Sequence, residues 1–85
     1  MIYCDEPRKY KARGQRWSHV FADDEASLTQ FAKEFSLRRR HRDPYLHYDV
    51  TAEELPALLA VGVVMLTRRQ SMEVMIRAHR KDLGL

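Results

Sequence analysis

The fold of this chain is best predicted from the stretch Tyr45-Leu46-His47-Tyr48-Asp49-Val50-Thr51, which has the pattern of a strand followed by a helix. Its apolar residues predict a short strand from Tyr45 to Val50, and Thr51 is a residue type that caps helices. A junction between a strand and a helix is where small α/β proteins place chemistry, because its side chains project from a rigid element. The stretch therefore predicts a functional site at His47, Tyr48 and Asp49.

The segments after this junction alternate between helix and strand patterns. Thr51 to Glu54 matches a capping box and Gly62 is suited to end the helix that follows, although Pro56 conflicts with a helix that starts at Thr51. Val63 to Leu66 is a continuous apolar run, typical of a strand covered on both faces. A second capping box, Thr67 to Gln70, opens a last helix with an apolar stripe: Met72, Met75, Ile76, His79 and Leu83.

The first half of the chain adds two strands and one helix. Ile2 to Cys4 and Trp17 to Phe21 are predicted as short strands, separated by a basic loop from Arg8 to Arg16. The helix begins after Asp23 or Asp24 and has four apolar residues on its buried stripe: Leu28, Phe31, Ala32 and Phe35. The charged run from Arg38 to Pro44 is predicted as a loop.

These patterns predict one α/β domain over residues 1–85, with about three helices and a short, largely parallel sheet of three or four strands. The formal net charge of +3 permits an acidic partner but does not require one. The single cysteine, Cys4, and the lack of a leader or a long apolar segment predict a cytoplasmic protein outside the membrane. A small chain buries only roughly 60% of its unfolded surface, so a homo-oligomer is one way in which this chain could gain further stability.

Several short motifs occur in an order that resembles a known family. Tyr3-Cys4-Asp5, Trp17-Ser18-His19 followed by Asp23, and His47-Tyr48-Asp49-Val50 resemble the Tyr-x-Asp, Trp-Ser-His…Asp and His-Tyr-Asp segments of domain-of-unknown-function family 4031. That family consists of short bacterial and phage proteins. The chain departs from the family pattern at Pro56 and at Thr67-Arg68-Arg69-Gln70. The resemblance covers nearly the whole chain and implies a fold and a site position, but no activity.

Carboxylates and imidazoles form a candidate ligand set for a divalent metal: Asp5, His19, Asp23, His47 and Asp49. Asp5 and Asp49 each follow a strand pattern, so we expect them side by side as metal ligands. His19, His47 and Asp49 are the candidate catalytic residues, as ligands or as a general base. The structural alternative is that the aspartates cap helices while the histidines form ordinary hydrogen bonds.

Two basic segments and the junction supply candidate ligand-binding residues: Arg13, Arg16, Trp17, Arg38, Arg39, Arg40, His41 and Tyr48. Arginine suits phosphate oxygens and an aromatic ring can stack on a base, so these residues predict a nucleotide or nucleic acid as partner. Arg68 and Arg69 oppose the dipole of the last helix unless an anion lies nearby. The alternative is a solvated basic surface.

Two functions follow from these sites. In the first, the domain binds a phosphate-bearing ligand at the junction of His47, Tyr48 and Asp49. In the second, it is a metal-dependent phosphohydrolase or nuclease that uses Asp5, His19, His47 and Asp49.

Overall fold

The computed structural model describes residues 1–9 and 14–85, which form a mixed sheet and three helices. The strands are β1 (Ile2–Cys4), β2 (Arg8–Lys9), β3 (Arg16–Ala22), β4 (Arg39–His41), β5 (His47–Thr51) and β6 (Val64–Met65). The helices are α1 (Glu25–Glu34), α2 (Leu55–Ala60) and α3 (Arg68–Asp82). No helix in the described ranges has the length and apolar character needed to cross a membrane.

The strands run in the order β4-β5-β3-β1-β6, and β2 pairs with β3. Among the described residues, only β1 and β6 pair in parallel, whereas the other four of the five strand pairs are antiparallel. The prediction of a largely parallel sheet with three or four strands is therefore wrong. The reason is that β5 lies between two antiparallel neighbours, β3 and β4, so helix-strand alternation along the chain did not translate into parallel neighbours in the sheet.

Charged segments that were predicted as loops contain the two strands that the sequence did not reveal. Arg39–His41 forms the outer strand β4, with all three residues exposed, and Arg8–Lys9 forms β2. An outer strand with solvent on both faces needs no apolar alternation, and charged side chains protect its free edge. Tyr10 to Arg13, the rest of the expected basic loop, lie outside the described residues.

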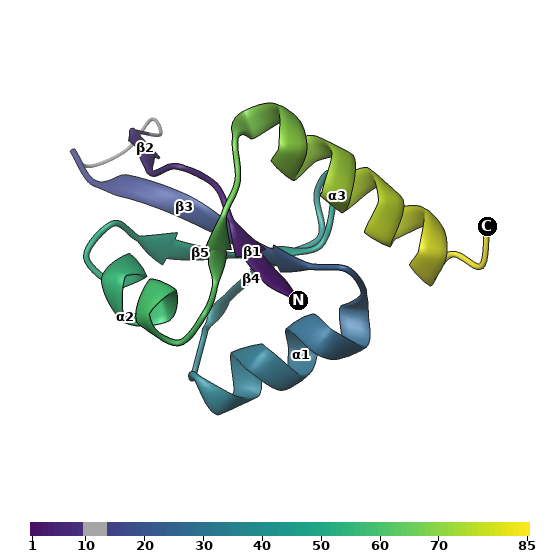
Figure 1. Ribbon diagram of the computed structural model, residues 1–85, viewed down its shortest axis with the longest axis horizontal. Coiled ribbons are helices and arrows are strands. Elements are labelled where there is room, and N and C mark those ends of the chain that lie inside the picture. The colour runs from purple at the N-terminus through teal and green to yellow at the C-terminus, as the bar shows by residue number, and fades with distance from the viewer. Residues whose placement is uncertain (10–13) are drawn as a thin grey trace.

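The hydrophobic core lies between one face of the sheet and helices α1 and α2, which lie below the strands in Figure 1. Its residues come from five elements and one connection: Cys4, Val20, Ala22, Leu28, Ala32, Tyr48, Val50, Leu55, Leu58 and Val63. Asp24 caps α1 by accepting a hydrogen bond from the Ser27 amide, as the sequence predicted. The expected burial of Phe35 is wrong, because this residue follows the end of α1 and is 39% exposed.

The second half of the chain differs from the predicted secondary structure at α2 and at β6. The capping box of Thr51 and Glu54 forms, but α2 begins only at Leu55, so Pro56 lies in its first turn, where no backbone donor is lost. Strand β6 is not covered on both faces, because it is an outer strand with Val64 36% and Met65 40% exposed. Helix α3 has the predicted capping box of Thr67 and Gln70.

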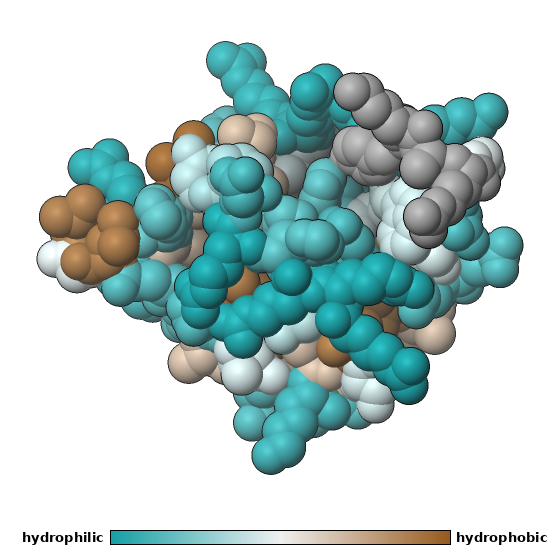
Figure 2. Space-filling view, turned by 180° about the vertical axis from the view of Figure 1, so that it is seen from behind, coloured by the Kyte–Doolittle hydropathy of each residue, from teal (hydrophilic) through white to brown (hydrophobic). Residues whose placement is uncertain are grey.

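Helix α3 lies on the other side of the sheet from α1 and covers only part of it (Figure 1). Met75 is its buried apolar contact, while three other residues of the predicted stripe, Met72, Ile76 and Leu83, are 40%, 39% and 60% exposed. Hydrophilic residues cover most of the side of the molecule seen in Figure 2. Because α3 covers only part of its face of the sheet, the middle of β3 and β5 is open to solvent on that face.

Candidate metal centre

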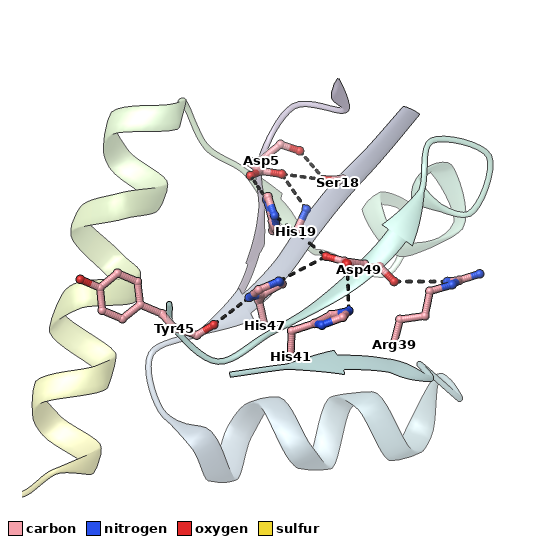
Figure 3. Close-up of polar contacts among 8 residues, drawn as sticks. All are labelled: Asp5, Ser18, His19, Arg39, His41, Tyr45, His47 and Asp49. Atoms are coloured by element: carbon pink, nitrogen blue, oxygen red, sulfur yellow. Dashed lines mark hydrogen bonds and ion pairs between the residues drawn. The ribbon is translucent and has the colours of Figure 1, made fainter. Parts of the chain in front are cut away.

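Strands β3, β5 and β4 bring ionisable side chains together on this open face (Figure 3). His19 of β3 is the direct partner of Asp49 in β5, and His47 is the partner of His41 in β4. Residues two apart in a strand point to the same face, so His47 and Asp49 project together and Tyr48 points the other way. Tyr48 is accordingly part of the hydrophobic core, away from this cluster.

The ligand atoms of His19, His47 and Asp49 all lie within 4.8 Å of one another. The Asp49 Oδ1 atom is 3.3 Å from His47 Nε2 and 4.0 Å from His19 Nε2. Ligands bound about 2.0–2.1 Å from a tetrahedral zinc ion are themselves roughly 3.3 Å apart. A small inward movement of His19 would therefore complete a three-ligand site. His41 Nε2 lies 3.0 Å from Asp49 Oδ2 at the rim.

Hydrogen bonds to the opposite nitrogen orient both histidine rings of this group. His47 Nδ1 lies 2.7 Å from the carbonyl oxygen of Tyr45, which can only accept, so Nδ1 carries the proton. His19 Nδ1 lies 2.6 Å from Asp5 Oδ2. Each ring thus presents Nε2 toward Asp49. Carboxylates and carbonyls placed behind histidine ligands in this way are the usual support of metal sites.

Asp5 is fixed in place by the end of β1. Its Oδ1 atom accepts hydrogen bonds from the His19 amide at 2.7 Å and the Ser18 hydroxyl at 3.1 Å. Burial disfavours the charged carboxylate, but these bonds and the His19 ring outweigh burial and hold the pKa of Asp5 below its ordinary value. Asp5 is therefore placed behind His19, whereas the sequence predicted it as a metal ligand beside Asp49.

The two histidines have different electrostatic surroundings. The hydrogen bond with Asp5 raises the pKa of His19, with burial acting in the opposite direction. Burial is the main cause that lowers the pKa of His47, which has only 6% of its surface exposed. The buried His47 ring is therefore held in the neutral form that a metal requires.

A groove of about 410 Å³ opens beside the cluster. Its walls are formed by Trp17, His19, Arg39, His41, Asp43, Pro44, His47 and Asp49. The guanidinium of Arg39 lies 4.8 Å from the centre of the Trp17 ring and also contacts Glu54 at 3.1 Å. Solvent and a ligand can thus reach Asp49, whose side chain is 28% exposed.

The structure brings only part of the predicted ligand-binding set to this groove. Trp17, Arg39 and His41 line it, whereas Arg40 pairs with Glu25 of α1 and Arg16 donates to the Pro7 carbonyl. Arg38 is exposed near the end of α1, and Arg13 lies outside the described residues. Asp23, from the wider metal set, binds the Tyr3 hydroxyl and the N-terminal amine instead.

Sequence reasoning missed Ser18 and the Tyr45 carbonyl as supports of the site. Ser18 is fully buried and bonds both the carbonyl and the carboxylate of Asp5. A polar residue between two predicted core positions was the available signal for Ser18. No side chain type reveals a backbone carbonyl, so the Tyr45 contact needed the structure.

Comparison with known proteins agrees with the motif resemblance. The model of a family described as protein of unknown function (DUF4031) matches residues 2–78, which include every member of the cluster. No curated protein and no solved structure matches the chain significantly. Since the match spans nearly the whole sequence, the chain belongs to the DUF4031 family.

Proposed function

We propose that this protein binds one divalent transition metal through His19, His47 and Asp49 and uses it to hydrolyse a phosphate-bearing substrate. The observation that carries this proposal is the convergence of three ligand atoms within 4.8 Å, with each ring nitrogen directed inward by a bond on its far side. Two imidazoles and one carboxylate form a ligand set that suits zinc, iron or manganese.

The hydrogen-bond pattern supports a cation at this point. Because His47 Nδ1 donates to the Tyr45 carbonyl, the neutral ring has a lone pair on Nε2. That lone pair faces a carboxylate oxygen of Asp49 at 3.3 Å. Two acceptors that face each other at this distance repel unless a proton or a metal ion lies between them. A metal ion satisfies both atoms and accommodates His19 Nε2 as the third ligand.

Three protein ligands leave coordination positions for water and for a substrate oxygen. A metal in such a site lowers the pKa of its bound water and polarises a phosphoryl oxygen. The groove provides a wall of Arg39 and Trp17 next to these positions. The Arg39–Glu54 pair is about half exposed and therefore weak, so Arg39 can turn to a phosphate oxygen.

A second candidate function is binding of a nucleotide or nucleic acid without turnover. The stacking of Arg39 on Trp17 favours this candidate, because such a wall accepts both a phosphate and a base. The two candidates share the groove and differ only in whether a bound metal activates water.

Metal titration followed by turnover assays tests the proposal. We expect one Zn²⁺ or Co²⁺ ion per chain, with binding lost in His47→Gln and Asp49→Asn. His79→Gln on α3 and Asp43→Asn, a groove carboxylate outside the ligand cluster, are matched controls that should bind normally. Equal metal binding in all four variants would refute the site.

Hydrolysis of bis(p-nitrophenyl) phosphate and of short oligonucleotides then separates the two candidates. The enzyme proposal predicts turnover that requires metal and disappears in His47→Gln and Asp49→Asn. Retained metal and oligonucleotide binding without turnover of either substrate would favour the binding module.

A further inference from the structure

We propose a second ligand site in this protein, a phosphate-binding pocket between β2 and the first turn of α3, lined by Arg8 and Arg68. This pocket is a cavity of about 260 Å³ that shares only His19 with the metal groove. It goes beyond the proposed function because it requires no metal. Its volume corresponds to several waters at about 30 Å³ each, which is room for a phosphate group.

The pocket has an apolar floor and a basic rim. Met72 and Met75 of α3 form the floor, with Ser71 beside them fully buried and bonded to the Thr67 carbonyl. Arg8 reaches the pocket from β2 and Arg68 from the first residue of α3. Two guanidinium groups at one cavity repel each other, and a shared anion removes this repulsion.

These two arginines differ from those of β4 and its flank. Arg39, Arg40 and Arg42 each pair with a glutamate. In the ranges 1–9 and 14–85, neither Arg8 nor Arg68 forms an ion pair, although Asp5 lines the same pocket. Both Asp5 oxygens already accept bonds from Ser18 and His19. Asp5 therefore offsets only one of the two arginine charges, and the described side chains that line the pocket keep a net positive charge.

The position of Arg68 also agrees with an anionic occupant. Arg68 occupies a first helical turn that contains no acidic residue, where a positive charge is unfavourable. An anion at the rim would relieve this effect. Phosphate is the chemistry expected, because forked guanidinium groups match its oxygens.

The test is a titration with inorganic phosphate in the presence of EDTA, followed by amide shifts in ¹⁵N NMR spectra. We expect the largest shifts at Arg8, Arg68 and Ser71. Arg8→Gln and Arg68→Gln should each weaken the affinity about tenfold, the usual effect of one lost charged hydrogen bond. Arg69→Gln, in the same helical turn but outside the pocket, should bind phosphate like the native protein.

A parallel titration with a short single-stranded oligonucleotide distinguishes a phosphodiester from free phosphate as the source of the group. Loss of oligonucleotide binding in the same two variants assigns the pocket to nucleic acid, and binding of inorganic phosphate alone assigns it to a free phosphate or monoester. The proposal is overturned if neither ligand binds, or if Arg69→Gln weakens binding as much as Arg68→Gln does.

Metal titration of the same variants keeps this inference separate from the proposed function. Arg8→Gln and Arg68→Gln should retain native metal affinity, because neither residue belongs to the ligand cluster. Their unfolding midpoints should also stay close to the native value, since neither side chain makes an ion pair in the described structure. Phosphate binding without metal binding would leave the pocket standing and remove the metal centre.

Discussion

Asp5→Asn is the substitution that most sharply tests how the metal centre is supported. The amide oxygen of asparagine can keep the bonds that Asp5 Oδ1 accepts from Ser18 and from the His19 amide. The amide nitrogen then takes the place of Oδ2, which lies 2.6 Å from His19 Nδ1. An amide nitrogen donates, so the His19 proton moves from Nδ1 to Nε2. The nitrogen that faces Asp49 can then no longer bind a metal.

The expected loss follows from the role of the carboxylate. Removing a partner behind a histidine ligand costs about 10- to 100-fold in metal affinity, or roughly 1.4–2.7 kcal/mol. Competition titration with a chromophoric zinc chelator measures this loss. Asp23→Asn is the control, because Asp23 binds Tyr3 and the N-terminus away from the cluster.

NMR of the imidazole nitrogens separates orientation from direct ligation. If Asp5 acts through His19, Asp5→Asn changes the His19 tautomer in the metal-free protein as well. If Asp5 is itself a ligand, as the sequence suggested, metal binding falls while the His19 tautomer stays the same. An affinity within twofold of the native value, together with an unchanged tautomer, would refute the reasoning.

Three further predictions concern the fold. Leu28→Ala should lower the free energy of unfolding by about 2–5 kcal/mol, because Leu28 is 1% exposed. Phe35→Ala should lower it clearly less, because Phe35 is 39% exposed. Urea unfolding measures both values, and equal losses would contradict the assigned core. Burial is the main cause that raises the pKa of the Cys4 thiol to about 11. The thiol should therefore react with a disulfide reagent at pH 8 only after unfolding, and rapid reaction of the native protein would contradict its burial. Hydrogen bonding to Ser27 lowers the pKa of Asp24 from 3.8 to about 2, so its stabilisation is complete above pH 3.8 and is lost as the pH falls toward 2. Asp24→Asn keeps a capping acceptor and should flatten the stability profile in that window, and an unchanged profile would exclude Asp24 as its origin.

The helices could be predicted because their signals are local. Asp24 caps α1, Thr67 and Gln70 form the capping box of α3, and both contacts lie within one turn of the chain. Strands β4 and β2 could not be predicted in the same way. Arg39 to His41 form a strand because β5 lies beside them, and nothing in their own composition favours an extended conformation.

The candidate site could be predicted in part for the same reason. The shared face of His47 and Asp49 follows from the two-residue period of a strand. The approach of His19 depends on its register opposite Asp49, which is set by long-range packing. The assumption of a parallel sheet placed Asp5 beside Asp49, but β3 lies between β1 and β5, so Asp5 contacts His19 instead.

X-ray absorption spectroscopy of the protein loaded with one equivalent of Zn²⁺ tests the central claim most directly. Two imidazole nitrogens and one carboxylate oxygen should appear in the first coordination sphere of the zinc ion at about 2.0–2.2 Å, and water oxygen should fill the remaining position. His47→Gln should retain no zinc, the imidazole signal should fall to one ring in His19→Gln, and two rings should remain in His79→Gln. Failure of the native protein to retain zinc, or a zinc environment that His19→Gln and His47→Gln leave unchanged, would contradict the metal centre described above.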